Sequence, residues 1–216
     1  MLKVTGLSKI YDKDIAVLED ITFEVKRGEF VVILGPSGAG KTTIFRHIWL
    51  EELPTKGEIE FEKLKSSSIR KSQIPFWRKR MGIVFQDLKL LNDRDVFENV
   101  ALPLRIKGKR EKEITKKTID ILNQLGLLVH RSSYPFELSA GEKQRLALAR
   151  AMVAEPLIIL ADEPTVHLDA ESASGIISLL RDANLGGTTI LMATNQRGLL
   201  GSFAHRVIGL EKGRIV

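Results

Sequence analysis

Eight consecutive residues combine the types and the spacing that phosphate binding requires. The pattern G-x-x-x-x-G-K-[ST] is matched at every fixed position, by Gly35, Gly40, Lys41 and Thr42. Glycines let the backbone wrap closely around phosphate oxygens, and the N-terminus of a following helix adds partial positive charge. Lys41 would reach the β- and γ-phosphates, and the Thr42 hydroxyl would bind Mg²⁺. We therefore predict a nucleoside triphosphate site made of Gly35, Pro36, Ser37, Gly38, Ala39, Gly40, Lys41, Thr42 and Thr43.

The context of this loop supports the prediction. An apolar run at residues 30–34 precedes it and reads as a buried strand, and residues 43–50 that follow it have a helical pattern. An ordinary glycine-rich turn with an incidental lysine is the alternative, and the order of strand, loop, Lys-Thr and helix argues against it.

Two carboxylates at the end of another apolar run suggest hydrolysis. Asp162 and Glu163 follow residues 157–161, and ligands of open α/β sheets bind at the carboxyl ends of the strands. Asp162 would hold Mg²⁺ directly or through water, and Glu163 would orient or deprotonate the attacking water. Alone, the pair would read as turn residues before Pro164. Beside Lys41, we interpret it as part of the site.

The elements that must position these residues indicate an α/β fold. Uninterrupted apolar runs predict a parallel central sheet, at 30–34, 157–161 and 189–193. Shorter, partly alternating runs predict an antiparallel layer at its side, at 2–5, 21–25 and 58–61. Helical spacing predicts a helical subdomain inserted into this core, from 96–104, 109–125 and 139–154.

Composition excludes several classes of protein. The chain has 216 residues, of which 44% are hydrophobic and 28% charged, so it is neither disordered nor collagen-like. It has no cysteine, which excludes disulfides, thiolate metal sites and a cysteine nucleophile. No apolar stretch approaches the ~20 residues that cross a bilayer, and the first residues lack a signal-peptide pattern, so we expect a cytoplasmic protein. The net charge of +6 admits nucleic acid or an anionic membrane as partners, although a solvated basic surface is the simpler interpretation.

Further segments resemble those of one family, the ABC ATPases. Residues 138–145, Leu-Ser-Ala-Gly-Glu-Lys-Gln-Arg, resemble its signature motif. Gln86 resembles the Q-loop glutamine, residues 167–169 occupy the D-loop position, and Tyr11 resembles the aromatic residue that stacks on adenine. The resemblance spans nearly the whole chain and implies the ABC ATPase form of the P-loop NTPase fold. We expect a single domain, 1–216, with a nucleotide-binding core at 1–86 and 157–216 and a helical signature subdomain at 87–156.

The resemblance also implies the roles of these residues toward ATP and Mg²⁺. Gln86 would join Thr42 and Asp162 at the metal, and would act in catalysis with Lys41, Glu163 and Asn195. An ATP-dependent homodimer is implied, in which each ATP also contacts the second subunit through Ser139, Ala140, Gly141, Glu142 and Asp169. Ser139-x-x-Glu142 is also a capping box, so a simple helix start is the alternative, and we expect both.

A closer resemblance is to the cell-division branch of this family, carried by residues 74–87 and 90–104. It implies an integral membrane partner of FtsX type that regulates peptidoglycan hydrolysis. The chain would then lie peripherally on the inner face of the plasma membrane, through its partner. The lipoprotein-release and macrolide-efflux branches remain alternatives. A nucleic-acid partner is disfavoured, because ABC ATPases of that kind usually carry tandem domains.

The chain departs from the family pattern at three places. Asn195 stands where the family has a histidine, and it can donate a hydrogen bond but cannot become a cation. Ala140 replaces a glycine, which would weaken the dimer if this position needs a positive φ and would be neutral otherwise. Val166 and His167 replace the usual Gly-Asn. A nucleotide-gated switch with little turnover is therefore a second hypothesis.

Overall fold

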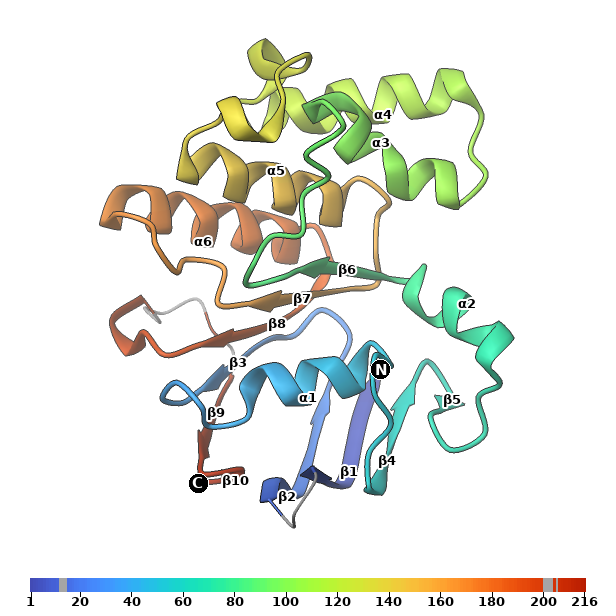
Figure 1. The fold of residues 1–216 in the computed structure, drawn as a ribbon, viewed down its shortest axis with the longest axis vertical. Helices are drawn as coiled ribbons and strands as arrows, with labels where there is room; N and C mark the ends of the chain where they lie inside the picture. Colours follow the sequence, from blue (N-terminus) through green and yellow to red (C-terminus); the bar gives the residue numbers. More distant parts are fainter. Residues whose placement is uncertain (12–14, 200–203, 205) are drawn as a thin grey trace.

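The computed structural model describes residues 1–11, 15–199, 204 and 206–216, which form two β-sheets and their covering helices (Figure 1). Among these residues, the larger sheet has six strands in the order β10-β9-β3-β8-β7-β6. Neighbouring strands run parallel, except that β9 and β10 are antiparallel. The strands are β3 (Phe30–Leu34), β6 (Met81–Val84), β7 (Ile158–Asp162), β8 (Thr189–Thr194), β9 (Arg206–Glu211) and β10 (Arg214–Ile215). The predicted mostly parallel central sheet is confirmed.

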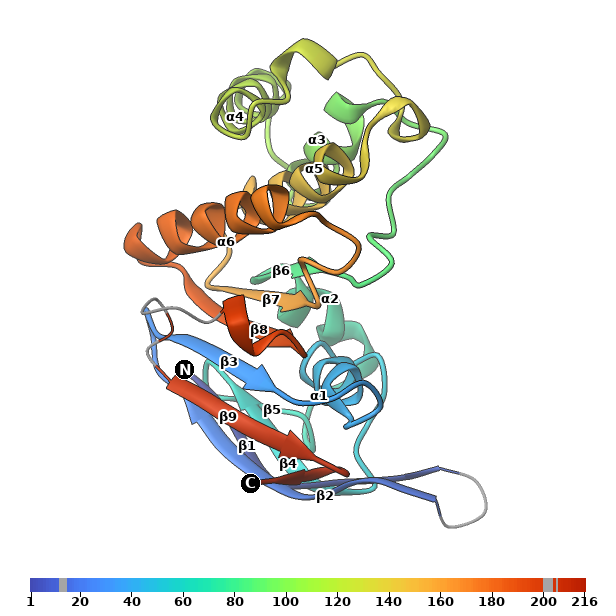
Figure 2. The same ribbon diagram turned by 90° about the vertical axis from the view of Figure 1, so that its left-hand side faces the viewer.

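The second sheet is antiparallel, as predicted. Within the described residues its order is β2-β1-β4-β5. Its strands are β1 (Leu2–Tyr11), β2 (Ile15–Val25), β4 (Lys56–Phe61) and β5 (Leu64–Lys65). Figure 2 shows it at the end of the molecule farthest from α4.

Alternate residues of the central strands enter two hydrophobic cores. In β3, Val31 and Ile33 join the core shared with the antiparallel sheet and α1 (Lys41–Ile48). Phe30 and Val32 join the core on the opposite face, which is shared with the larger helices. Both faces of the central sheet are therefore covered, which explains the uninterrupted apolar runs.

Three longer helices lie between β6 and β7 in the chain, and α6 (Ala170–Leu185) lies between β7 and β8. The three are α3 (Val96–Ile106), α4 (Glu111–Gln124) and α5 (Ala140–Met152). Figure 1 shows them stacked above α6 on one face of the central sheet. Short 3₁₀ turns occur at η2 (Lys71–Gln73), η3 (Leu128–His130), η4 (Pro135–Glu137) and η5 (Arg197–Leu199). Among the described helices, none combines the length and the apolar character needed to cross a membrane.

Two central strands, β6 and β9, were not predicted from the sequence. β6 has only four residues, and a Cβ on its Gly82 would lie 2.3 Å from the carbonyl oxygen of Ala151. The glycine is needed for this close approach of α5, but it weakens the strand pattern. β9 begins at Arg206 and ends at Glu211 and pairs with β3. Its charged ends shorten the apolar run by which a strand is recognised in the sequence.

The helix α2 (Ile74–Arg78), also missed, packs on the C-terminal end of α1. The Trp77 indole N–H donates to the carbonyl oxygen of Ile48 at 2.8 Å. The Arg78 guanidinium donates to the carbonyl oxygens of Trp49 and Leu50, each at 2.9 Å. These side chains satisfy carbonyl groups that the end of a helix leaves without partners. Trp77 is fully buried, whereas its neighbour Phe76 is 64% exposed.

Replacing Trp77 should therefore cost far more stability than replacing Phe76. We expect Trp77→Ala to lower the free energy of unfolding by about 3–5 kcal/mol, because it leaves a cavity and an unsatisfied carbonyl group. Phe76→Ala should stay within about 0.5 kcal/mol of the parent. Urea denaturation of the two variants checks this, and equal losses would contradict the packing described here.

Candidate nucleotide-binding site

The loop between β3 and α1 has the glycine-dependent geometry that its sequence predicts. Gly38 has a φ of 80°, and no atom lies within 4 Å of the place where its Cβ would stand. Gly40 caps α1 in the left-handed conformation, with a φ of 104°. Gly35 is needed for another reason, because a Cβ there would lie 2.2 Å from the carbonyl oxygen of Leu210. The loop thus opens at Gly38 and is fixed against β9 at Gly35.

Lys41 and Glu163 form a buried ion pair at this loop. The Lys41 Nζ lies 3.0 Å from the Glu163 Oε1, and the two side chains are 5% and 9% exposed. Nζ also donates to the carbonyl oxygens of Gly35 and Pro36, at 2.7 and 3.0 Å. Glu163 directly follows β7 and has a φ of 47°, while its backbone N–H donates to the Ala193 oxygen of β8 at 2.9 Å. Pairing with β8 therefore holds this carboxylate against the phosphate loop.

Asn195 joins the same cluster from the end of β8. Its backbone N–H donates to the Glu163 Oε2 at 3.2 Å. Its side-chain Nδ2 lies 3.5 Å from the Ser37 hydroxyl of the loop. The structure thus brings Lys41, Glu163 and Asn195 together at the carboxyl ends of three neighbouring strands.

Asp162, at the end of β7, is a buried carboxylate with one oxygen atom that has no partner. It is 1% exposed, the Thr42 side chain lies close enough to lower its pKa, and its Oδ1 has no hydrogen-bond partner. Burial raises the pKa of Asp162 from 3.8 to about 6, and the nearby Glu163 adds to the rise. A buried carboxylate oxygen without a partner beside a threonine hydroxyl fits a hard divalent cation.

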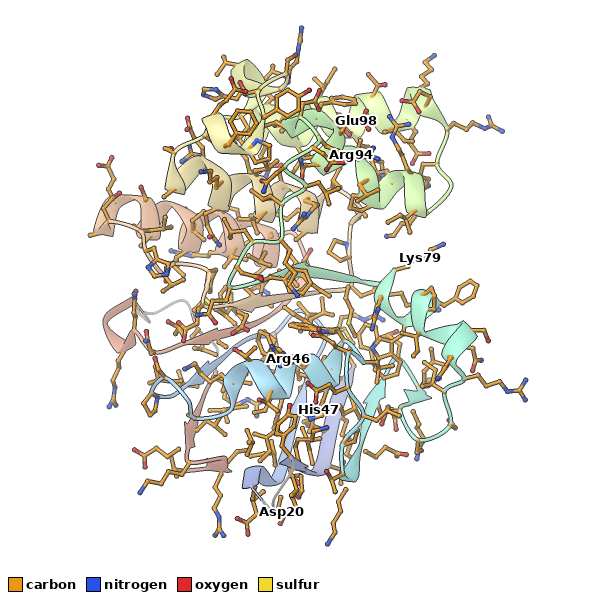
Figure 3. All side chains as sticks on the ribbon, in the orientation of Figure 1. Asp20, Arg46, His47, Lys79, Arg94 and Glu98 are labelled. Atoms are coloured by element: carbon orange, nitrogen blue, oxygen red, sulfur yellow. The ribbon has the colours of Figure 1, made fainter. Side chains whose placement is uncertain are left out.

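A pocket of about 540 Å³ contains all three residues predicted to bind metal, Thr42, Gln86 and Asp162. Arg46, which Figure 3 shows on α1, also lines it. So does His167, whose φ of 66° is one that histidine adopts more readily than most residues. The sequence analysis gave His167 no role of its own, and only the folded chain places it in the lining of the pocket that contains Gln86 and Asp162.

A second pocket, of about 550 Å³, lies at the other end of the central sheet. It is lined by residues that precede β3, β7 and β8, including Arg27, Leu157 and Thr188. Ligands of parallel α/β sheets bind at the carboxyl ends of the strands, so the pocket beside Asp162 is the candidate nucleotide site.

The signature residues start α5 as a capping box. The Ser139 N–H donates to the Glu142 carboxylate at 2.8 Å, and the Glu142 N–H lies 3.4 Å from the Ser139 hydroxyl. Hydrogen bonds from Ser139 lower the pKa of Glu142. Ala140 is the first helical residue and its φ is not positive, so the methyl group at this position introduces no backbone strain.

The same region lies beside Asp169. The Asp169 carboxylate caps α6 by accepting hydrogen bonds from the Ser172 N–H and hydroxyl, both at 2.9 Å. A Cβ on Gly141 would lie 3.3 Å from that Ser172 hydroxyl. Two capped helix N-termini, of α5 and α6, are thus adjacent, and both are exposed at their caps. The four signature residues and Asp169 form a group separate from Lys41.

Tyr11 is placed apart from the pocket beside Asp162, whose lining does not include it. Its hydroxyl donates to the Glu52 carboxylate at 2.8 Å, and the Lys9 Nζ lies 4.7 Å from the centre of its ring. Burial and the Glu52 hydrogen bond raise the pKa of Tyr11. The sequence analysis missed both neighbours. The two-residue period of a strand places Lys9 on the same face as Tyr11, whereas no local pattern points to Glu52.

Comparison with known proteins identifies the family of this chain. The profile of the ABC transporter family matches residues 18–166. The cell division ATP-binding protein FtsE of Streptococcus pneumoniae serotype 2 is 39% identical over 216 residues, covering 100% of this chain and 94% of that protein. FtsE of Escherichia coli K12 is 37% identical over 215 residues, covering 100% of this chain and 97% of that protein.

Solved structures give the same result for the fold. A dimeric bacterial ABC transporter cassette superposes with a TM-score of 0.92 at 33% identity, covering 100% of this chain and 96% of that one. A dimeric post-hydrolysis state of an ATP-binding cassette, bound to ADP and Pi, matches with the same values.

The raised pKa of Asp162 predicts how the stability of the folded protein changes with pH. Because the folded-state pKa of Asp162, about 6, exceeds its ordinary value of 3.8, the folded protein keeps this proton to higher pH than the unfolded chain does. Stability is therefore lost as the pH rises between these two values. Without metal or nucleotide at pH 7.5, Asp162→Asn should therefore be more stable than the parent, by up to about 3 kcal/mol, with the advantage disappearing near pH 4.

Thermal unfolding in EDTA across this pH range measures the effect. Asp169→Asn is the control of opposite sign, because hydrogen bonds from Ser172 lower the pKa of Asp169 and favour its charged form. A parent protein more stable than Asp162→Asn at pH 7.5 would contradict the prediction.

Proposed function

Because this chain belongs to the ABC transporter family, we propose that it is the ATP-hydrolysing subunit of a membrane complex of the FtsE–FtsX type. The observation that carries the proposal is the convergence of Lys41, Glu163 and Asn195 at the phosphate loop, with Asp162 beside Thr42. The FtsE relatives, which align along the whole chain, support the assignment to the cell-division branch.

In this proposal each residue has a task toward ATP. The backbone N–H groups around Gly38 bind phosphate oxygens, and the N-terminus of α1 adds its partial positive charge. Lys41, already beside the loop carbonyl groups, binds the β- and γ-phosphates. Glu163 accepts the proton of the attacking water, and Asn195 orients the Glu163 carboxylate through its backbone N–H. Tyr11, held by Glu52, stacks on adenine.

The residues of the pocket fit Mg²⁺. Asp162, Thr42 and Gln86 would hold it, since all three line one pocket and the Asp162 Oδ1 lacks a partner. When bound, the ion would neutralise charge on the transferring phosphate. The Thr42 side chain, which lies beside Asp162 and lowers its pKa, would share the ion with that carboxylate.

We place the second contact to each ATP in a partner copy of this chain. The adjacent N-termini of α5 and α6 present Ser139, Ala140, Gly141, Glu142 and Asp169 on an exposed surface. Helix N-termini attract anions, which suits the γ-phosphate held by the other subunit. The two dimeric ABC cassettes of the same fold support this arrangement.

The membrane partner in this proposal is an integral protein of FtsX type. The chain then acts from the inner face of the plasma membrane, bound peripherally through that partner, and its ATP-driven motion regulates peptidoglycan hydrolysis. The names of the FtsE relatives support this role in cell division.

Steady-state hydrolysis of Mg-ATP by the purified chain tests the catalytic assignment. Lys41→Ala should abolish turnover, because it removes the cation from the phosphates. Asn195→His should raise turnover by about ten- to a hundred-fold. This factor corresponds to the free energy that one charge-assisted hydrogen bond contributes in the transition state. Turnover that survives Lys41→Ala would contradict the proposal, and an unchanged rate in Asn195→His would show that a cationic side chain at this position does not stabilise the transition state.

Glu163→Gln should retain ATP and trap the dimer. Removing the base blocks hydrolysis, whereas the amide keeps the size of the side chain and a partner for Lys41. We expect light scattering after gel filtration with Mg-ATP to show the mass doubling from 24.2 kDa. Glu155→Gln, a change at an exposed glutamate that pairs with Lys117, is the matched control and should remain monomeric. A Glu163→Gln variant that stays monomeric at saturating ATP would contradict the dimer.

A further inference from the structure

The positive charge of this chain is concentrated in one segment. Residues 63–86 contain no Asp or Glu, although the chain as a whole has 27 of them. The same residues include seven cations, which exceeds the net charge of +6 of the entire chain; they are Lys63, Lys65, Arg70, Lys71, Arg78, Lys79 and Arg80. All seven lie within residues 63–80, which we call the basic segment. Outside it, the chain carries no excess of positive charge.

Most of these cations have no internal partner. Lys65 pairs with Glu58 at 2.8 Å, and Arg78 donates a hydrogen bond to the Trp49 carbonyl oxygen at the end of α1. Within the residues that the structure describes, the others form no ion pair with a carboxylate, namely Lys63, Arg70, Lys71, Lys79 and Arg80. By contrast, Lys109 and Lys117 of the other lysine-rich stretch pair with Glu113.

An exposed aromatic ring lies among these cations. Phe76 is 64% exposed, and the Lys79 Nζ lies 5.8 Å from the centre of its ring. Trp77 is buried and holds α2 against α1, so the backbone that carries Phe76 is fixed. Figure 1 shows α2 and β5 together at one edge of the molecule, and Figure 3 places Lys79 there.

The basic segment and the nucleotide loop adjoin opposite ends of α1. Trp77 and Arg78 bind the C-terminal end of α1, whereas the phosphate loop adjoins its N-terminal end. Residues 69–80 do not line the pocket beside Asp162. The segment is therefore free to bind a partner while ATP is bound.

We propose that the basic segment, with Phe76 at its centre, is a docking surface for the anionic lipid headgroups of a membrane. Unpaired lysines and arginines around an exposed phenylalanine are the composition of an interfacial membrane anchor, in which cations meet anionic lipid and the ring enters the boundary of the acyl chains. A surface for single-stranded nucleic acid would offer more than one exposed ring for stacking on bases. This contact needs no membrane protein and does not rest on the proposed function.

Vesicle flotation of the purified chain tests the surface. The protein should float with vesicles of phosphatidylcholine containing 30% phosphatidylglycerol, should not float with phosphatidylcholine alone, and should be released as salt is raised from 50 to 500 mM. Lys71→Glu/Lys79→Glu should lower binding at least about tenfold. Phe76→Ala should weaken it severalfold without changing its dependence on salt.

The matched control is Lys112→Glu/Lys116→Glu, which makes the same charge change on exposed positions of α4. It should keep most of the binding, and an equal loss would overturn the proposal, since net charge alone would then explain it. Equal binding to both kinds of vesicle, or to neither, would also overturn it. Binding to duplex DNA or polyglutamate without vesicle binding would assign the cations to another class of partner. ATP hydrolysis without vesicles should be unchanged in Lys71→Glu/Lys79→Glu, so this test can fail while the proposed function stands.

Discussion

The buried contact between Lys41 and Glu163 is the constraint on which the rest of the site depends. Burying two charges is costly unless each is fully satisfied. Here the three protons of the Lys41 ammonium face three acceptors, the Gly35 and Pro36 oxygens and the Glu163 Oε1. The other Glu163 oxygen accepts the Asn195 N–H. These bonds form only if β3, β8 and β7 are neighbours in that order, because each strand delivers one of the partners. The strand order of the central sheet therefore also determines which residues meet at the phosphate loop.

The ends of three helices, α1, α5 and α6, form the other contacts discussed above. The N-terminus of α1 faces the phosphate loop, and its C-terminus is closed by Trp77 and Arg78 of α2. The basic segment and the nucleotide loop are thus attached to opposite ends of one helix. A second pair of helix ends, those of α5 and α6, meets where Gly141 lies against Ser172. Both N-termini are solvent-exposed at their caps and carry the partial positive charge of helix N-termini. In the proposed dimer they would face the ATP held by the second copy.

Local signals predicted much of this architecture and missed its non-local parts. The loop glycines, the capping box at Ser139 and the carboxylates after β7 follow from short patterns, and the structure has each of them. The strand β9 was missed because its polar ends lack a periodic signature, although it fills the place beside β3. Gly35 was assigned to phosphate approach, whereas its tightest neighbour is the Leu210 oxygen of that same unpredicted strand. The role of a residue was therefore least predictable where its neighbour comes from a distant part of the chain.

The sequence by itself determined the chemistry of this protein: a phosphate loop, an acidic pair after a buried strand, a capped signature helix, and a cluster of cations without acids. Each is a contiguous pattern, because backbone conformation and periodicity act over a few residues. The tertiary structure alone decided which of these groups meet. It placed His167 in the same pocket as Gln86, brought Glu52 to the Tyr11 hydroxyl, and gave Ala140 a conformation that needs no glycine. Such contacts depend on the packing of sheets and helices far apart in the chain, and no local preference encodes them.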